Sequence, residues 1–277
     1  MRFIHFILSH TVFIACCAAG LCFQTNLLLH LPHHPELYGF IFFSTLCSYN
    51  FYWLLSKFYF SDRHAHLVFL KENLSFLVVF FFAAAGTVFF MVRLPHLLPY
   101  VLIGMALTLV YSLPLWPFPF SKNLQKAGIF KTTLLSLTWA YVTTVLPAAG
   151  LPGEIIVPVT LLFSARFFFM LLLCIIFDMR DISVDKMHGL HSLATDVTKK
   201  KLSILIFIVF IFYIISGIFV RNYFGDDQQI IAFAVTGILV WLVYRLSLKP
   251  RGYIFYYFLV DGLMLLSALL SLIAGSL

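Results

Sequence analysis

Long runs of apolar residues, separated by short polar segments, make up almost the whole chain. A helix needs about 20 apolar residues to cross a hydrocarbon core of about 30 Å. Because lipid offers the backbone no hydrogen-bond partner, segments of this length must be helical. The pattern predicts nine membrane-spanning helices, at residues 3–23, 37–56, 73–92, 96–114, 132–149, 155–177, 202–220, 229–247 and 253–274.

The composition supports an all-α integral membrane protein. Hydrophobic residues make up 62% of the chain and charged residues only 10%, which is too little charge to cover a soluble domain of 277 residues. All five cysteines lie in apolar runs, which argues against a disulfide framework. The first apolar run is followed by many similar ones, so we interpret it as a retained helix and not a cleaved signal peptide. With no internal repeat and no added soluble segment, residues 1–277 are predicted to form one transmembrane domain.

The net charge of +7 is arranged as a membrane topology signal and not as a nucleic-acid surface. Of the 18 Lys and Arg residues, 15 fall at the N-terminus or in alternate loops, and the opposite loops hold only Arg93 and Arg221. Positive loops mark the cytoplasmic face. We therefore expect a multi-pass protein of a bacterial inner (plasma) membrane. Its N-terminus would face the cytoplasm, its C-terminus would lie outside, and no nucleic acid would be a partner.

Three of the 11 acidic residues, Asp178, Asp181 and Asp185, lie within eight positions at the cytoplasmic edge of the sixth run. On a helix, Asp181 and Asp185 at i, i+4 share a face with Cβ atoms about 5–6 Å apart. Their charges repel unless water screens them or a cation binds between them. Mg²⁺ suits such oxygen ligands and binds one or two carboxylates together with substrate phosphates. The alternative is a solvated loop in which the aspartates pair with Arg180 and Lys186.

The same stretch carries a family resemblance. The pattern D-x-R-D-x-x-x-D-x-x-x-G-x-x-S-L at 178–193 resembles the second aspartate motif of the UbiA superfamily of intramembrane prenyltransferases. It also lies in the expected place, the cytoplasmic loop after the sixth helix. A softer similarity is YSLP at 111–114, followed by a basic loop. The residues that match the aspartate motif are Asp178, Arg180, Asp181, Asp185, Gly189, Ser192 and Leu193. The basic residues that follow YSLP are Lys122, Lys126 and Lys131.

The resemblance implies a ring of helices around a central, lipid-accessible cavity. It implies that Mg²⁺ binds the diphosphate of an isoprenoid donor and assists its departure, so that a polyprenyl group passes to an acceptor in the membrane. Asp181 and Asp185 would be the catalytic metal ligands, and Asp178 a third ligand or a supporting group. Tyr111 would contact the phosphate or the acceptor.

The chain departs from the family pattern at the end of the second helix. The first motif of the family is N-D-x-x-D-x-x-x-D, whereas residues 49–58 here read YNFYWLLSKF. Asn50 matches the Asn of the family motif and is a candidate for substrate binding. None of the three Asp positions of the motif carries a carboxylate in this chain. Lys57 shares a helix face with Asn50 and would place an ammonium near the diphosphate. The alternative is an ordinary lysine at the membrane edge.

The remaining candidates are charged residues near the expected site. Lys122 and Lys126 are candidate phosphate contacts, and Arg180 would support the aspartates. Arg166, about 18 Å from Asp178 along the sixth helix, and Asp261 in the last helix are cavity candidates, because charges at membrane depth face a cavity or each other.

Two further function classes stay open. The first is a catalytically degenerate protein that binds isoprenoid lipid or supports a partner membrane enzyme. The second, a channel or transporter, has little support, because the two halves of the sequence hold no matching pair of short helices broken by Gly or Pro.

Overall fold

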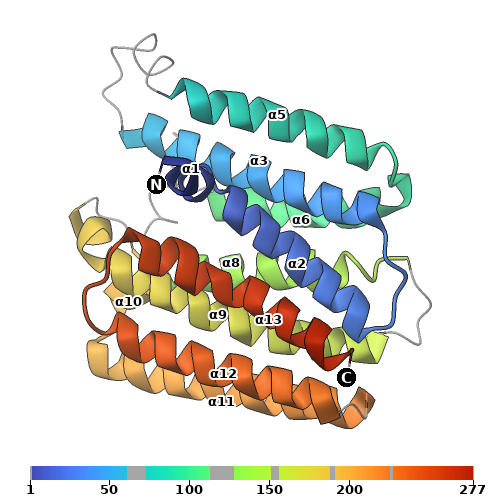
Figure 1. Ribbon diagram of the computed structural model, residues 1–277. Coiled ribbons are helices and arrows are strands. Elements are labelled where there is room, and N and C mark those ends of the chain that lie inside the picture. Colours follow the sequence, from blue (N-terminus) through green and yellow to red (C-terminus); the bar gives the residue numbers. More distant parts are fainter. Residues whose placement is uncertain are drawn as a thin grey trace.

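The computed structural model describes residues 2–60, 73–112, 128–150, 156–187, 191–224 and 227–276. These residues form helices and contain no β-strand (Figure 1). The elements are α1 (Arg2–Ser9), α2 (Val12–Leu28), α3 (Pro35–Phe60), α5 (Leu74–Met91), η1 (Pro95–Leu97), α6 (Leu98–Ser112), α8 (Gly128–Ala140), η3 (Tyr141–Val145), α9 (Ile156–Met187), α10 (Leu193–Asp196), α11 (Lys199–Phe224), α12 (Asp227–Ser247), η5 (Phe255–Val260) and α13 (Asp261–Ala274).

The apolar runs coincide with helices, as expected for a chain whose backbone must satisfy its own hydrogen bonds in lipid. Six helical segments are long and apolar enough to cross a membrane, and α2 is a shorter apolar helix. The chain is therefore an all-helical, multi-pass membrane protein, while the count of nine spans stays a prediction. The six segments are Leu74–Met91, Pro95–Ser112, Ile156–Ser183, Lys199–Val220, Asp227–Ser247 and Phe255–Ala274.

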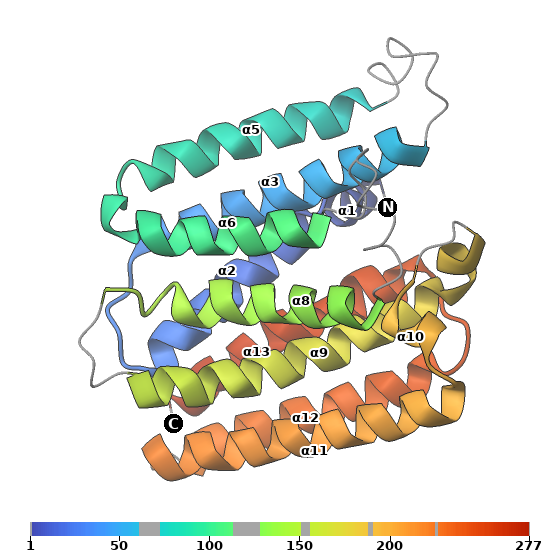
Figure 2. The same cartoon turned by 180° about the vertical axis from the view of Figure 1, so that it is seen from behind.

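The helices run alongside one another, with α9 near the centre and α5 at the edge (Figures 1 and 2). Of the apolar window of α9, 61% is buried, against 6% for α5. Helix α9 packs against α8 and α11, α2 packs against α3 and α13, and α3 packs against α5. The N-terminus and α10 lie at one end of the bundle and the C-terminus at the other. The apolar face of α5 is exposed, which suits contact with lipid.

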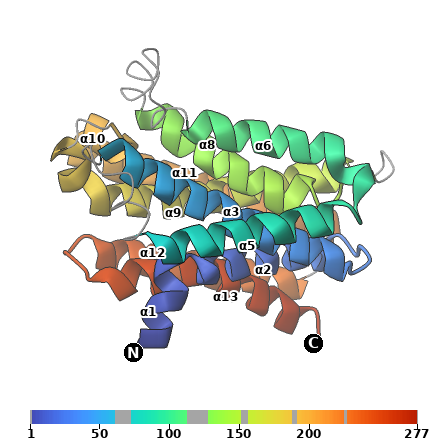
Figure 3. The ribbon, with the colours of Figure 1, turned by 90° about the horizontal axis from the view of Figure 1, so that it is seen from above.

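Two kinds of helix break shape the bundle. The first predicted run divides into α1 and α2, because Thr11 has a left-handed conformation with φ 62°. Helix α1 consequently projects from the bundle beside the N-terminus (Figure 3). The segments η3 and η5 are π-helical, a conformation that is often found at functional sites. Both segments adjoin the candidate site described below.

The sixth predicted helix is longer than its apolar run. It begins at Ile156, as expected, but continues to Met187 instead of ending near residue 177. The expectation that the aspartates lie in a loop is therefore wrong, because Asp178, Asp181 and Asp185 all belong to α9. Their polarity marks where α9 leaves the apolar environment and not where the helix ends. The i, i+4 geometry expected for Asp181 and Asp185 is the geometry of this last part of α9.

Candidate functional site

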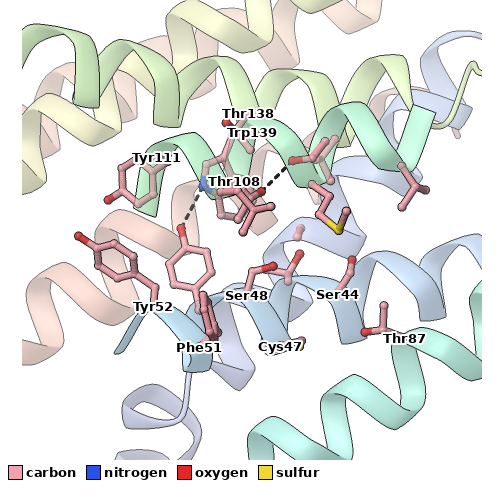
Figure 4. Close-up of a pocket in the computed structure, with 18 of the residues that line it drawn as sticks. Ser44, Cys47, Ser48, Phe51, Tyr52, Thr87, Thr108, Tyr111, Thr138 and Trp139 are labelled. Atoms are coloured by element: carbon pink, nitrogen blue, oxygen red, sulfur yellow. Dashed lines mark hydrogen bonds between the residues drawn. The ribbon is translucent and has the colours of Figure 1, made fainter. Parts of the chain in front are cut away.

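A cavity of about 500 Å³ lies between α3, α5, α6, α8 and η3. Its wall is largely apolar, with hydroxyl groups from several helices, a composition typical of ligand pockets. Figure 4 shows Tyr52 of α3 and Tyr111 of α6 on the same side of the cavity, away from Thr87 of α5. Trp139 of α8 donates a hydrogen bond from Nε1 to the Tyr49 hydroxyl, 3.0 Å away. This bond joins two opposite walls of the cavity.

Helix packing explains why space remains between α3 and α6. Helix α3 fits closely against α5 because Gly39 and Gly86 admit the rings of Phe90 and Phe43, which would collide with any added Cβ. Helix α6 instead packs against α8, and its packing against α3 and α5 is slight within the described part of the chain. The cavity occupies the resulting gap beside the exposed helix α5, where an apolar ligand can enter from lipid.

Asp178 connects three elements near this cavity. Its Oδ2 accepts a hydrogen bond from Thr132 Oγ1 of α8 at 2.6 Å and another from the backbone N–H of Leu193, which begins α10, at 3.3 Å. Both bonds go to the same oxygen, so Asp178 is held in one orientation while Oδ1 stays available. Hydrogen bonds of this kind typically orient a carboxylate that binds a metal.

Asp181 is already paired. Arg180 donates from Nε to Oδ1 and from Nη2 to Oδ2 of Asp181, each over 2.7 Å. The Arg180 guanidinium lies 4.8–5.3 Å from the ring centroids of Phe177, Tyr256 and Tyr257. The last two rings belong to η5, so this π-helical segment positions the Arg180–Asp181 pair. The pairing that the sequence allowed for Arg180 is present, and it makes Asp181 a poorer metal ligand than its neighbours.

Asp185 and Lys131 carry opposite charges and interact electrostatically. Burial raises the pKa of the Asp185 carboxyl above its usual value, and the Lys131 ammonium opposes that rise. Burial also lowers the pKa of Lys131, but Tyr52, Asp185 and Asp178 more than offset it, so Lys131 remains charged. Its Nζ lies 5.8 Å from the centroid of the Tyr111 ring. Lys131 thus links the aspartates to the side of the cavity formed by Tyr52 and Tyr111.

In the sequence, Lys131 is the last basic residue after YSLP, and the motifs do not single it out as a site residue. Its spacing from that motif was the available signal, but only the position of α8 shows which way its side chain turns. Lys122 and Lys126 lie outside the described residues. Tyr111 lines the cavity, and its contact with a phosphate or an acceptor stays a prediction.

The carboxylates present suit Mg²⁺ only in part. No group of three or more His, Cys, Asp or Glu side chains converges on one point among the residues that the structure describes. Mg²⁺ nevertheless needs only one or two carboxylates when phosphate oxygens and water complete its shell. Asp178 and Asp185 meet that need, because both interact with Lys131 and with each other. The donor set therefore fits a magnesium ion that arrives with a phosphate ligand.

The two candidates on α3 do not face this site. Asn50 is fully buried, and its Nδ2 donates to the backbone oxygens of His10 and Leu46 and to Thr11 Oγ1. It stabilises the break between α1 and α2 and does not line the cavity. Lys57 is exposed, with Nζ 5.4 Å from the centroid of the Trp53 ring. The sequence-based assignment of both residues to substrate binding is thus not supported by their positions.

Arg166 and Asp261 are each only 4% exposed, but neither lines the cavity. Arg166 donates from Nη2 to the backbone oxygen of Leu21 at 3.5 Å, and its Nη1 has no partner. Asp261 lies behind the cavity wall, where it interacts electrostatically with Tyr49 and Arg180. The structure shows no ion pair between Arg166 and Asp261.

Comparison with solved structures places this arrangement among known folds. The chain is similar to the apo structure of a UbiA homolog from Aeropyrum pernix K1, with a TM-score of 0.59 and 13% sequence identity. The similarity covers 96% of this chain and 97% of that one. No family model and no curated protein sequence matches the chain. The expected UbiA-type fold is therefore confirmed over nearly the whole length.

Proposed function

We propose that this chain is a membrane prenyltransferase that transfers a polyprenyl group from its diphosphate to an acceptor within the bilayer, with Mg²⁺ as cofactor. One observation carries the proposal. A largely apolar cavity beside an exposed helix has Tyr52 and Tyr111 in its wall, and these residues adjoin Lys131, Asp178 and Asp185. A polyprenyl diphosphate has the same division into a long apolar tail and a compact anionic head.

Each part of the site has a definite task in this reaction. The cavity holds the tail and excludes water from the reacting carbon. Asp178 and Asp185 would hold Mg²⁺, which neutralises charge on the departing diphosphate when bound. Thr132 and the Leu193 N–H fix the orientation of Asp178. The rings of Tyr52 and Tyr111 present aromatic faces, which attract positive charge that develops on an allylic carbon.

The orientation in the membrane forms part of the proposal. The excess of Lys and Arg in alternate loops supports a cytoplasmic location for the N-terminus and the aspartates, in a bacterial inner (plasma) membrane. A water-soluble cation and a charged head group would then reach the site from the cytoplasm, and the tail from the lipid.

The experiment is equilibrium binding of labelled geranylgeranyl diphosphate to the detergent-purified protein, with Mg²⁺ or with EDTA. Wild type is compared with Asp185→Asn and with Asp227→Asn, a matched loss of one carboxylate at the opposite end of the bundle. We expect Mg²⁺ to strengthen binding in wild type and in Asp227→Asn, but not in Asp185→Asn. Binding that Mg²⁺ does not affect in any of the three proteins would contradict the proposal.

A transfer assay with a panel of membrane-soluble acceptors then separates the two functions that the sequence left open. Prenylated product identifies an enzyme. Mg²⁺-dependent binding without product from any acceptor favours a protein that binds isoprenoid lipid or supports a partner membrane enzyme. Binding without product would agree with the sequence, because the end of α3 carries no carboxylate.

A further inference from the structure

The candidate site has an uneven distribution of charge. Asp178, Asp181 and Asp185 all belong to α9, whereas α3 contributes Phe51 and Tyr52 to the cavity wall on the other side. A diphosphate head group carries several negative charges. Among the residues that the structure describes, the end of α3 offers these charges no carboxylate that could recruit a second cation. Charge neutralisation on that side therefore needs a group that belongs to the protein.

The backbone of Lys131 is held in a position from which its ammonium can neutralise charge on that side. Helix α8 begins at Gly128, whose backbone lies so close to α10 that an added Cβ would be 2.5 Å from the Ser192 carbonyl carbon. One residue after Lys131, the Thr132 hydroxyl is bonded to Asp178. These two contacts, one on each side of Lys131, fix the start of α8 against α10 and α9. The backbone of Lys131 is thus anchored on both sides.

The surroundings of the Lys131 side chain point it toward the head group of a ligand in the cavity. It interacts with Tyr52 of α3, with the Tyr111 ring of α6, and with Asp178 and Asp185 of α9. Lys57, in comparison, is exposed beside Trp53, and Lys249 is exposed beyond the end of α12. Lys131 therefore lies between the carboxylates of α9 and the aromatic residues of α3 and α6.

We propose that Lys131 binds the diphosphate directly. As a fixed ammonium, it supplies positive charge where the end of α3 carries no carboxylate to hold a second metal ion. This inference rests on the proposed function and identifies a head-group residue of the same site. It implies that part of the affinity for the diphosphate does not depend on Mg²⁺.

The charges of the site also imply cooperation between Lys131 and the metal. Without a ligand, the ammonium of Lys131 is balanced by Asp178 and Asp185. If these carboxylates held Mg²⁺, the ion would balance their charge in place of Lys131, and the ammonium of Lys131 would be left to interact with the diphosphate. A lysine suits this task as a compact point charge with three rotatable donors.

The experiment measures binding of two probes, inorganic diphosphate and labelled geranylgeranyl diphosphate, with Mg²⁺ and with EDTA. The variants are Lys131→Met, which keeps the length of the side chain but removes its charge, and Lys131→Arg, which keeps the charge. Lys249→Met is the matched control on an exposed lysine, and Lys57→Met tests the lysine that the sequence suggested. A thermal denaturation curve of each variant confirms that it is folded.

We expect wild type to bind both probes weakly in EDTA. Lys131→Met should weaken binding by about 10- to 100-fold in both conditions, the loss typical of a hydrogen bond to a charged group. Lys131→Arg should retain most of the affinity, and the variants of Lys57 and Lys249 should bind as wild type does.

Several results would overturn the inference. Equal binding by Lys131→Met and wild type would remove Lys131 from the site and leave the proposed function intact. Binding by wild type only in the presence of Mg²⁺ would show that no fixed charge replaces a metal, even if Lys131→Met did not fold. A loss in Lys57→Met that is absent from Lys131→Met would transfer the role to Lys57. Failure of wild type to bind the labelled diphosphate in either condition would defeat the proposed function as well.

Discussion

The ends of α3 and α9 lie at the same end of the bundle but contribute opposite chemistry (Figure 1). The end of α9 presents Asp178, Asp181 and Asp185. Thr132 donates a hydrogen bond to Asp178 and Arg180 pairs with Asp181, whereas the Lys131 ammonium interacts electrostatically with Asp185. The end of α3 presents Phe51 and Tyr52 to the cavity and carries no acidic residue. One wall thus carries charged side chains and the other aromatic ones, and the proposed function assigns the head group to the first and the tail to the second.

Under the proposed function, a site for a charged ligand would carry its charge on one wall only. On α3, the single residue that matches the family pattern, Asn50, has all its donor contacts within the protein. Asn50 holds the junction of α1 and α2 against α3, and it does not line the cavity. The chemistry of the site is therefore concentrated on α8 and α9.

The largest effect is expected from the aspartates of α9. Asp185→Asn should reduce Mg²⁺-dependent prenyl transfer to background, because it removes a carboxylate that is not committed to an arginine. Asp181→Asn should lower the rate of prenyl transfer by about 10-fold, as expected for a group that supports the metal ligands without binding the ion. Initial rates over a range of Mg²⁺ concentrations measure both. Equal loss in the two variants would show that Asp181 leaves Arg180 and becomes a ligand.

Adding a carboxylate to α3 tests the other side of the contrast. Phe51→Asp places a charge in the apolar wall and removes the ring that packs 6.1 Å from Phe80. We expect the free energy of unfolding to fall by about 2–3 kcal/mol, the scale of an acidic residue within a membrane helix. Thermal denaturation in detergent, with and without Mg²⁺, measures the change.

Leu248→Asp is the matched control, because Leu248 is 52% exposed, lies beyond the end of α12 and is outside the first family motif, so its replacement should alter stability little. Stabilisation of Phe51→Asp by Mg²⁺, absent in Leu248→Asp, would contradict the expectation. It would mean that the end of α3 is ready to hold a metal once a carboxylate is present.

A smaller effect is expected at Asn50. Asn50→Ala removes all three donor contacts to His10, Thr11 and Leu46, and should lower the free energy of unfolding by about 1–3 kcal/mol. The affinity of the folded protein for diphosphate should not change. Thermal denaturation and binding, measured beside the exposed control Asn222→Ala, separate the two effects. A loss of affinity greater than the loss of stability would return Asn50 to the substrate site.

The helical class and the place of the aspartates could be predicted because lipid leaves the backbone few choices. The apolar runs locate helices, and the i, i+4 spacing of Asp181 and Asp185 is meaningful on any helix. The end of α9 could not be predicted from hydrophobicity, because a helix that leaves the membrane can continue in water as far as Met187. Polarity marks the interface and not the helix terminus.

The directions of individual side chains also could not be predicted from the sequence. Lys57 and Lys131 both lie among mainly apolar residues at a membrane edge, yet Lys57 is exposed and Lys131 is half-buried between three helices. The two partners of Asn50 outside its own helix lie 39 and 40 residues away, at a helix break that depends on a left-handed Thr11. Such contacts depend on how helices pack, and helices that are apolar on every side give little sign of which face is buried.

The smallest effect is expected in the part of the cavity that is distant from the charges. Thr108 of α6 lines the cavity, and its hydroxyl is bonded only to the Gly104 carbonyl of its own helix (Figure 4). Thr108→Phe should therefore fill space without removing a contact between helices. In a cavity of about 500 Å³ the added ring should weaken binding of long prenyl diphosphates by about 10-fold, the scale of a change of one or two methylene groups in an apolar pocket.

Competition among diphosphates of increasing prenyl length measures the effect of Thr108→Phe, with inorganic diphosphate and a Thr160→Phe variant as controls. Thr160 is exposed on α9 and also bonds only within its own helix, to the Ile156 carbonyl. Because the ring touches only the tail, affinity for inorganic diphosphate should stay at the wild-type value while the preference shifts to shorter chains. A uniform loss for all ligands would mean that the tail does not occupy this cavity. The apolar wall would then bind the acceptor, and the contrast between a charged wall and a tail-binding wall would no longer hold.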